Sequence, residues 1–247
     1  MNLQQFFTSY PKVAVAFSGG VDSSYLLYAA LQHAEEVMAF YVDGPFQPQF
    51  EKKDAFRLAE ELGADLHVIP VDILSNEKVI ANEKDRCYHC KSLIFTTILQ
   101  EAKALGYPVL LDGTNASDDF DDRPGMRALE ELKVLSPLRL AGLTKEDVRR
   151  LSKEANLFTW DKPAYSCLAT RIPTGTNVTK EGLERTERAE DFLFSLGFTD
   201  FRVRTVGNAA KIQLPESQME KLLHHRKDIL RYLNVLYDAV WLDLEGR

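Results

Sequence analysis

Ser18-Gly19-Gly20-Val21-Asp22-Ser23-Ser24 stands between a short apolar run, residues 13–17, and a segment that is expected to be helical to about residue 33. This order predicts a buried strand, a tight turn and a helix. Two adjacent glycines allow a close turn, and the first N–H groups of the helix and the serine hydroxyls then point toward one spot. The stretch therefore predicts an anion site, suited to phosphate, between a strand and a helix.

Two other kinds of turn have similar sequences. A glycine turn with a serine N-cap occurs at many strand-to-helix joints, but the whole string in this context favours a ligand site. A loop that cleaves the γ-phosphate of a nucleotide carries a Lys beside its Ser or Thr, and no Lys stands there. Asp22 instead provides a carboxylate where Mg²⁺ bound to pyrophosphate needs an oxygen ligand.

Outward from this loop, residues 12–112 alternate strand-like and helix-like segments, which predicts a parallel sheet covered by helices. Further strands are expected at residues 37–42, 66–71 and 108–111, and helices at residues 50–62 and 92–105. Residues 113–144 are polar, broken by Gly and Pro and acidic at 118–122, and they predict a long, solvated surface loop. Thr144 and Asp147 resemble a capping box that opens a helix to about residue 155.

A second pattern begins near Thr179, after an irregular stretch over residues 156–178. We expect a helix to about residue 196, strands near 201–206 and 210–214, a helix over 216–233 and a strand over 235–242. The expected fold is therefore α/β, with a parallel-sheet domain over residues 1–178. A smaller α+β domain over residues 179–247 would serve substrate binding or oligomerisation.

The composition excludes several classes of protein. With 45% apolar and 27% charged residues, the 247-residue chain has the composition of a globular protein. The longest apolar run, residues 25–31, is far below the roughly 20 residues that span a bilayer, and the first residues lack the pattern of a secretory signal. We therefore expect a cytoplasmic protein with no membrane partner. A net charge of −7 argues against duplex nucleic acid as a partner, but not against a small anionic nucleotide.

Three cysteines, Cys87, Cys90 and Cys167, are too few and odd in number for a disulfide framework. The C-x-x-C spacing of the first two fits half of a zinc site, a redox dithiol or iron–sulfur ligation. A zinc site would recruit Cys167 and one histidine, for which the candidates are His67, His89 and His225. A redox dithiol fits less well because no strand-to-helix start precedes Cys87, and Cys167 alone would also fit a buried thiol.

The stretch from Ser18 to Ser24 resembles the signature of the PP-loop ATP pyrophosphatases, which cleave ATP between its α and β phosphates. Residues 112–115 support the resemblance, because ligands bind at the carboxyl ends of parallel strands, although a polar turn would look the same. The resemblance implies ATP and Mg²⁺, with Asp22 as the Mg²⁺ ligand. The nucleotide-binding residues it implies are Ser18, Gly19, Gly20, Val21, Asp22, Ser23, Ser24, Asp112, Gly113, Thr114 and Asn115.

Cys167-Leu168-Ala169-Thr170-Arg171-Ile172-Pro173 is similar to the C-L-A-S-R-I-P string of the LarE-type ATP-dependent sulfur transferases, with Thr170 in place of Ser. The resemblance extends from Phe17 to about Val206. It implies an enzyme that adenylates a carboxylate of pyridinium-3,5-biscarboxylic acid mononucleotide, releases pyrophosphate and replaces the activated oxygen with sulfur. The product belongs to the biosynthesis of the nickel-pincer nucleotide cofactor of lactate racemase.

Two versions of this family differ in their source of sulfur. In one, the residue matching Cys167 gives up its own sulfur and becomes dehydroalanine. In the other, two more cysteines join it to hold a four-iron four-sulfur (4Fe-4S) cluster, whose open iron can carry a sulfide. Cys87, Cys90 and Cys167 match the second version, so the resemblance implies that these three residues and Asp22 are catalytic and that the three thiols bind the cluster.

A substrate with a phosphate and carboxylates needs cations, and Arg binds both groups with paired hydrogen bonds. The candidates are Arg171, four residues after Cys167, and Arg202 and Arg204, which a strand would direct to one face. Each would equally fit a solvated surface charge. Glu187 and Glu190 share a helix face that we expect at the surface, although they would also be placed to orient substrate or metal.

Three competing functions remain open. A PP-loop tRNA thiolase also uses three cysteines, but the net charge and the Cys167 string argue against it. An amide-forming synthetase would need a glutaminase nucleophile, for which no motif is present, and a nucleotide-sensing or zinc-stabilised protein would bind ATP without releasing pyrophosphate. We expect a small-molecule nucleotide substrate, no nucleic-acid partner and a homo-oligomer. The sulfide donor is not identified by the sequence.

Overall fold

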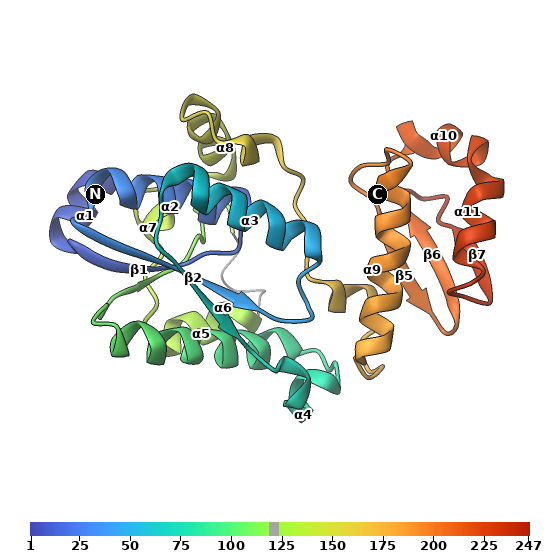
Figure 1. The fold of residues 1–247 in the computed structure, drawn as a ribbon, viewed down its shortest axis with the longest axis horizontal. Helices are drawn as coiled ribbons and strands as arrows, with labels where there is room; N and C mark the ends of the chain where they lie inside the picture. The colour runs from blue at the N-terminus through green and yellow to red at the C-terminus, as the bar shows by residue number, and fades with distance from the viewer. Residues whose placement is uncertain (119–123) are drawn as a thin grey trace. The chain divides into compact units, whose positions relative to one another are not determined.

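A computed structural model describes residues 1–118 and 124–247, and the chain forms two compact units (Figure 1). The first unit comprises Met1–Ile73 and Asp85–Lys162, and the second comprises Leu74–Lys84 and Pro163–Arg247. The expected boundary at residue 178 stays a prediction, because these units divide the chain at other residues. The acidic residues expected in a solvated loop at 119, 121 and 122 lie outside the described residues.

The first unit is built on the expected parallel sheet. Its four strands are β1 (Lys12–Ala16), β2 (Glu36–Asp43), β3 (Leu66–Pro70) and β4 (Leu110–Leu111), in the order β3-β2-β1-β4. Val15 pairs with Ala39 on one side and with Leu111 on the other, and all three are fully buried. The uninterrupted apolar run of β1 is typical of a parallel strand covered on both faces, and the predicted α/β fold is confirmed.

Helices form a layer on each face of this sheet (Figure 1). Val13 and Val15 of β1 belong to a core shared with α1 (Leu3–Ser9), α2 (Val21–His33) and α3 (Gln49–Leu62). Ala14 faces the opposite core, formed with α5 (Arg86–Ala104) and α6 (Pro124–Glu131). Side chains alternate between the two faces of a strand, so this short run serves both cores. The remaining elements of the unit are α7 (Pro137–Leu140), α8 (Lys145–Glu154) and the 3-10 helix Phe158–Asp161.

Two expectations for this unit are wrong. The helix expected at residues 92–105 begins at Arg86, so Cys87 and Cys90 lie in its first turn. The long loop expected over residues 113–144 contains α6 and α7, and Leu135 forms a parallel bridge with Leu111. The apolar face of α6 was hidden in the sequence because it is only eight residues long and begins with Pro124-Gly125. Proline is well tolerated at the start of a helix, so this pair does not prevent one.

The second unit has a three-stranded mixed sheet of β5 (Arg202–Val206), β6 (Ala209–Gln213) and β7 (Ala239–Leu242). β6 is antiparallel to β5 and parallel to β7. The helix expected over residues 216–233 is interrupted at His225 and forms the 3-10 helix Glu216–Gln218, α10 (Met219–His224) and α11 (Arg226–Leu233). The other elements are α4 (Glu77–Ile80), the 3-10 helix Leu168–Arg171 and α9 (Lys180–Ser195). The 3-10 helix Ile73–Ser75 spans the boundary between the units, because Ile73 belongs to the first and Leu74 to the second.

Asn82 ties the segment Leu74–Lys84 to the rest of the second unit. Its amide nitrogen donates to the backbone oxygens of Ile172, Pro173 and Thr176, at 3.3, 2.8 and 3.0 Å. Its side chain is buried, so these bonds satisfy a polar group that would otherwise be costly to bury. No helix within the described ranges is long and apolar enough to cross a membrane.

Candidate active site

The loop between β1 and α2 is closed by its own serines. Ser23 Oγ accepts the Ser18 N–H at 3.2 Å, lies 3.0 Å from Ser18 Oγ and donates to the Gly20 carbonyl at 3.2 Å. Gly20 is the N-cap of α2, and Val21 and Ser24 are buried behind it. The expected strand–loop–helix context of this stretch is therefore present, with the N-terminus of α2 at the loop.

Two glycines allow other segments to approach the loop closely. Gly19 has a φ of +76°, and a Cβ there would lie 2.7 Å from Ala55 Cβ in α3. A Cβ on Gly113 would lie 2.8 Å from the backbone nitrogen of Ser23. The Asp112–Asn115 stretch therefore rests directly on the first turn of α2, which brings together the two motifs that the sequence predicts to bind nucleotide.

Gly113→Ala should destabilise the protein by about 1–3 kcal/mol, because the added methyl meets backbone atoms that cannot rotate away. Urea denaturation measures this free energy of unfolding. Gly125→Ala is the matched control: its methyl would lie 2.7 Å from Cδ of Lys91, the flexible part of a side chain, so it should cost far less. Equal losses in the two variants would contradict the backbone contact as the cause.

Asp22, the expected Mg²⁺ ligand, is held by two side chains from distant segments. Asn115 Nδ2 donates to its Oδ1 at 3.2 Å, and Lys145 Nζ contacts its Oδ2 at 2.5 Å. Lys145 is the first residue of α8, whose predicted capping box between Thr144 and Asp147 is confirmed. Lys145 carries no motif in the sequence, and its contact with Asp22 spans 123 residues, so sequence reasoning missed it.

Asp112 lies inside the protein and holds the turn that follows β4. It accepts hydrogen bonds from Ser136 Oγ, at 2.5 Å, and from Thr114 Oγ1. Burial raises the pKa of its carboxyl group, and these two hydroxyls oppose the rise. Thr114 and Asn115 are also buried, so the polar groups of this turn are oriented by one another.

A cavity of about 360 Å³ opens at the carboxyl ends of the strands. Its lining includes the polar residues Ser18, Asp22 and Thr114, and apolar side chains such as Phe95 and Ile98 of α5 form another part of the wall. Lys91, which directly follows Cys90, also lines it. A small-molecule site commonly combines an apolar wall with a few directed polar groups, and a nucleotide has both kinds of surface.

Lys162 contacts the same loop from the side of α3. Its ammonium lies 2.9 Å from Glu51 and 2.7 Å from Asp54, and it donates to the Gly19 carbonyl at 3.5 Å. Arg149 of α8 donates to the backbone oxygens of Trp160 and Lys162. The turn at Gly19 is therefore supported by Lys162, whose ammonium is nearly buried and paired with two carboxylates.

The three cysteines are distributed over both units. Cys87 is exposed and Cys90 is half-buried, three residues apart at the start of α5, while Cys167 of the second unit is half-buried and is the N-cap of the 3-10 helix Leu168–Arg171. Arg86 Nη2 lies 3.7 Å from Cys87 Sγ. Within the described residues, no group of three or more His, Cys, Asp or Glu side chains is arranged to hold a metal ion.

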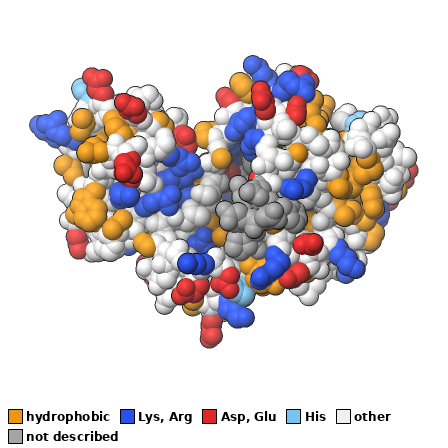
Figure 2. Space-filling model, turned by 180° about the vertical axis from the view of Figure 1, so that it is seen from behind, with side chains coloured by type: hydrophobic (Ala, Val, Ile, Leu, Met, Phe, Trp, Pro, Cys, Tyr) orange, Lys and Arg blue, Asp and Glu red, His pale blue; other side chains and the backbone are white. Residues whose placement is uncertain are grey.

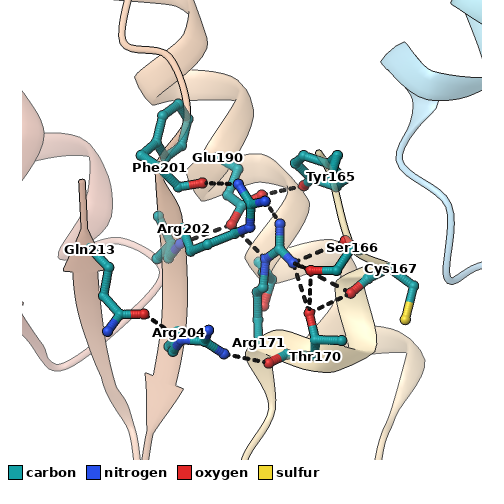
Figure 3. A network of polar contacts seen from close by, with 12 residues as sticks. Tyr165, Ser166, Cys167, Thr170, Arg171, Glu190, Phe201, Arg202, Arg204 and Gln213 are labelled. Atoms are coloured by element: carbon teal, nitrogen blue, oxygen red, sulfur yellow. Dashed lines mark hydrogen bonds and ion pairs between the residues drawn. The ribbon is translucent and has the colours of Figure 1, made fainter. Parts of the chain in front are cut away.

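A buried ion pair organises the segment around Cys167 (Figure 3). Arg171 and Glu190 are each 1% exposed, and two contacts of 2.9 and 3.1 Å join the guanidinium to the carboxylate. Glu190 also accepts the backbone N–H of Val203 at 2.8 Å and a hydrogen bond from the Tyr165 hydroxyl. The expectation that Glu190 lies at the surface is therefore wrong, whereas Glu187 is half-buried.

Arg171 holds the loop that carries Cys167. Its Nη1 donates to the Ser166 carbonyl and hydroxyl, both at 2.9 Å, and to Thr170 Oγ1 at 2.8 Å. The Cys167 side chain points away from this guanidinium (Figure 3). These contacts occupy Arg171 inside the protein, and its expected role in binding substrate stays a prediction.

Arg202 and Arg204 lie two residues apart on β5 and bind backbone oxygens. Arg202 donates to the carbonyls of Phe201 and Ala164, and Arg204 donates to that of Thr170. Among the described residues, no carboxylate forms an ion pair with either one. Burial, with Arg171 and Arg247 nearby, lowers the pKa of Arg202 to about 10. Figure 2 shows Lys and Arg side chains grouped on one face of this unit.

The parallel sheet, the serine–glycine loop and the cavity define a PP-loop ATP-utilising domain. Residues 12–93 match the model of the family described as queuosine biosynthesis protein QueC. The chain is 28% identical to the tRNA-specific 2-thiouridylase MnmA of Thermotoga sp., over 59% of this chain and 52% of that protein.

Two similar proteins extend over nearly the whole chain. One is the pyridinium-3,5-bisthiocarboxylic acid mononucleotide synthase of Lactiplantibacillus plantarum, 35% identical over 95% of this chain and 86% of that protein. The other is an uncharacterized protein of Synechocystis sp., 36% identical over 99% of this chain and 93% of that protein. The chain belongs to the LarE family and is an ATP-dependent sulfurtransferase, which confirms the resemblance stated from the sequence.

Proposed function

We propose that this chain adenylates a carboxylate of pyridinium-3,5-biscarboxylic acid mononucleotide and converts it to a thiocarboxylate, in the biosynthesis of the nickel-pincer nucleotide cofactor of lactate racemase. One observation carries the proposal. This chain is 35% identical, over 95% of its length, to a synthase of the bisthiocarboxylic acid mononucleotide. It also has the serine–glycine loop, a carboxylate suited to Mg²⁺ and apolar side chains around one cavity.

The first half-reaction uses the loop of the first unit. A substrate carboxylate oxygen attacks the α-phosphorus of ATP, the bond from this phosphorus to the bridging oxygen breaks, and pyrophosphate leaves with the electron pair. The N–H groups and hydroxyls of residues 18–24 bind the phosphates, and Asp22 offers its oxygens to Mg²⁺. These preoriented donors stabilise the charge that develops on pyrophosphate.

The second half-reaction uses the three thiols, which we propose as ligands of a 4Fe-4S cluster. Cys thiolates are the common ligands of such clusters, and Cys87 and Cys90 share one turn of α5 beside the cavity-lining Lys91. A cluster held by these three thiols would leave one iron open and would supply a sulfide there. That sulfur would replace the activated oxygen at the substrate's carbonyl carbon, and AMP would leave with that oxygen.

The second unit supports the binding of an anionic substrate. Arg202 is buried and Arg204 is half-buried, and within the described part of the chain neither forms an ion pair with a carboxylate. Burial lowers the pKa of both, and the nearby charge of Glu190 only partly opposes this, so the two cations are incompletely compensated. A phosphate or carboxylate group would compensate this charge with paired hydrogen bonds. We propose that these two residues bind the substrate mononucleotide.

Arg202→Met should weaken binding of the pyridinium mononucleotide by about 10- to 100-fold, the size of a charge-assisted hydrogen bond, and leave ATP binding unchanged. Isothermal titration calorimetry measures both affinities. Arg188→Met, on the exposed side of α9, is the control and should bind both ligands as the unmodified protein does. Equal losses for ATP and the mononucleotide, or none, would contradict the assignment.

The function as a whole is tested with protein purified without oxygen. We expect about four iron atoms per chain, pyrophosphate release that requires the pyridinium mononucleotide, and a product heavier by the replacement of oxygen with sulfur. An iron-free protein that converts Cys167 to dehydroalanine would replace the cluster with the sacrificial mechanism. Zinc without substrate-dependent pyrophosphate release, or thiolation of tRNA instead, would overturn the proposal.

A further inference from the structure

The phosphate loop has hydrogen-bond donors but no cation within its own sequence, and Asp22 adds a negative charge. A triphosphate with one Mg²⁺ retains net negative charge, so a further cation at the loop favours its binding. In the described part of the first unit, three ammonium groups are near: Lys91 lines the cavity, Lys145 contacts Asp22 and Lys162 contacts Gly19. Their surroundings separate their roles.

Lys162 is already engaged. It is matched by two carboxylates, those of Glu51 and Asp54, and its side chain is only 12% exposed. Moving it to a phosphate would leave those carboxylates beside each other without a cation. Lys91 belongs to the α5 wall of the cavity and lies near enough to Asp112 to oppose the rise in the pKa of that carboxyl. Neither ammonium is held at the carboxylate expected to bind Mg²⁺.

Lys145 is different, because its ammonium pairs with one carboxylate and its side chain is 35% exposed. Its backbone is well fixed: the N–H donates to Ser117 Oγ at 3.0 Å, and the capping box of α8 holds the preceding residue, Thr144. Four methylene groups separate the Lys145 backbone from its ammonium, so the ammonium can move while the backbone stays fixed. Asp22 is itself in the first turn of α2, where phosphate oxygens would bind.

We infer that Lys145 is a ligand of the ATP polyphosphate, exchanging Asp22 for a phosphate oxygen when Mg²⁺ binds that carboxylate. This inference rests on the proposed adenylation at the loop. Mg²⁺ and an ammonium compete for the same carboxylate oxygen, and the displaced ammonium finds phosphate oxygens at the adjacent helix N-terminus. The ammonium of Lys145 then stabilises the negative charge that grows on pyrophosphate as the bond to the α-phosphorus breaks.

The test is nucleotide binding by the full chain, measured by calorimetry without sulfur donor or pyridinium substrate. Lys145→Met should weaken binding of MgATP and of magnesium pyrophosphate at least tenfold and leave AMP binding unchanged, because AMP lacks the β and γ phosphates. Lys145→Arg, which keeps the charge, should retain most of the MgATP affinity. Lys153→Met removes an exposed lysine of the same helix and should change none of these affinities.

The outcomes separate this inference from the proposed function. MgATP affinity within twofold of the unmodified protein in Lys145→Met, or an equal loss for AMP and MgATP, would overturn the role of Lys145. Failure of the proposed function instead appears as unmodified protein that binds MgATP but makes no thiocarboxylate. Thermal unfolding of the Met and Arg variants shows whether each is folded. If the Met variant unfolds, Lys145→Gln, which also removes the charge, replaces it and is held to the same outcomes.

Discussion

Cys87→Ala should reduce thiocarboxylate formation from many products per chain to less than one. Removing one of three thiolate ligands leaves too few protein ligands to retain the proposed cluster, so the chain loses the iron that would carry sulfide. Product per chain is counted by mass spectrometry over time, and iron content is measured on the same preparation. Cys87 is exposed at the start of α5, so its replacement should leave the stability of the unit nearly unchanged.

Nucleotide chemistry is the internal control for this variant. The phosphate loop is formed by residues 18–24 and contains no cysteine, so substrate-dependent pyrophosphate release should persist in Cys87→Ala. Undiminished multiple turnover would refute Cys87 as a ligand. A single turnover that leaves dehydroalanine at residue 167, in this variant and in the unmodified protein alike, would establish Cys167 as the sulfur source.

Glu190→Gln should destabilise the second unit by about 3–5 kcal/mol. The substitution leaves the guanidinium of Arg171, which is 1% exposed, without its counter-charge, and an unpaired buried charge is among the most costly changes in a protein interior. The free energy of unfolding is measured by urea denaturation. Glu184→Gln, in an exposed ion pair with Lys180 on the same helix, is the control and should change stability by less than about 1 kcal/mol.

A double-mutant cycle identifies the cause of this loss. Arg171→Met in the Glu190→Gln background removes the unpaired charge, so the double variant should recover part of the stability that the single variant loses. It should not recover sulfur transfer, because Arg171 also holds Ser166 and Thr170 on either side of Cys167. Additive losses in the double variant would show that the ion pair is not the source of the destabilisation.

The strands and the phosphate loop could be predicted from local sequence. Residues 13–17 form an apolar run, and the observed strand, Lys12–Ala16, differs by one residue at each end. The start of α5 could not be predicted in this way, because Arg86-Cys87-Tyr88-His89-Cys90 has no strong helical signal of its own. The helix includes these residues because α5 packs against α6. Tertiary packing commonly outweighs weak local propensity.

The candidate site divides in the same way. Short-range patterns in the chain were enough to find the phosphate loop, the turn after β4, the cysteines and the arginines, since each depends on neighbouring residues and on the chemistry of their side chains. Three features depend on residues distant in the chain: the pairing of Lys145 with Asp22, the closeness of Gly113 to Ser23 and the burial of Glu190 against Arg171. Only the tertiary structure decides these, because a charge at helical spacing looks the same in sequence whether it faces water or a buried partner, and the free energy that selects between them comes from packing between segments.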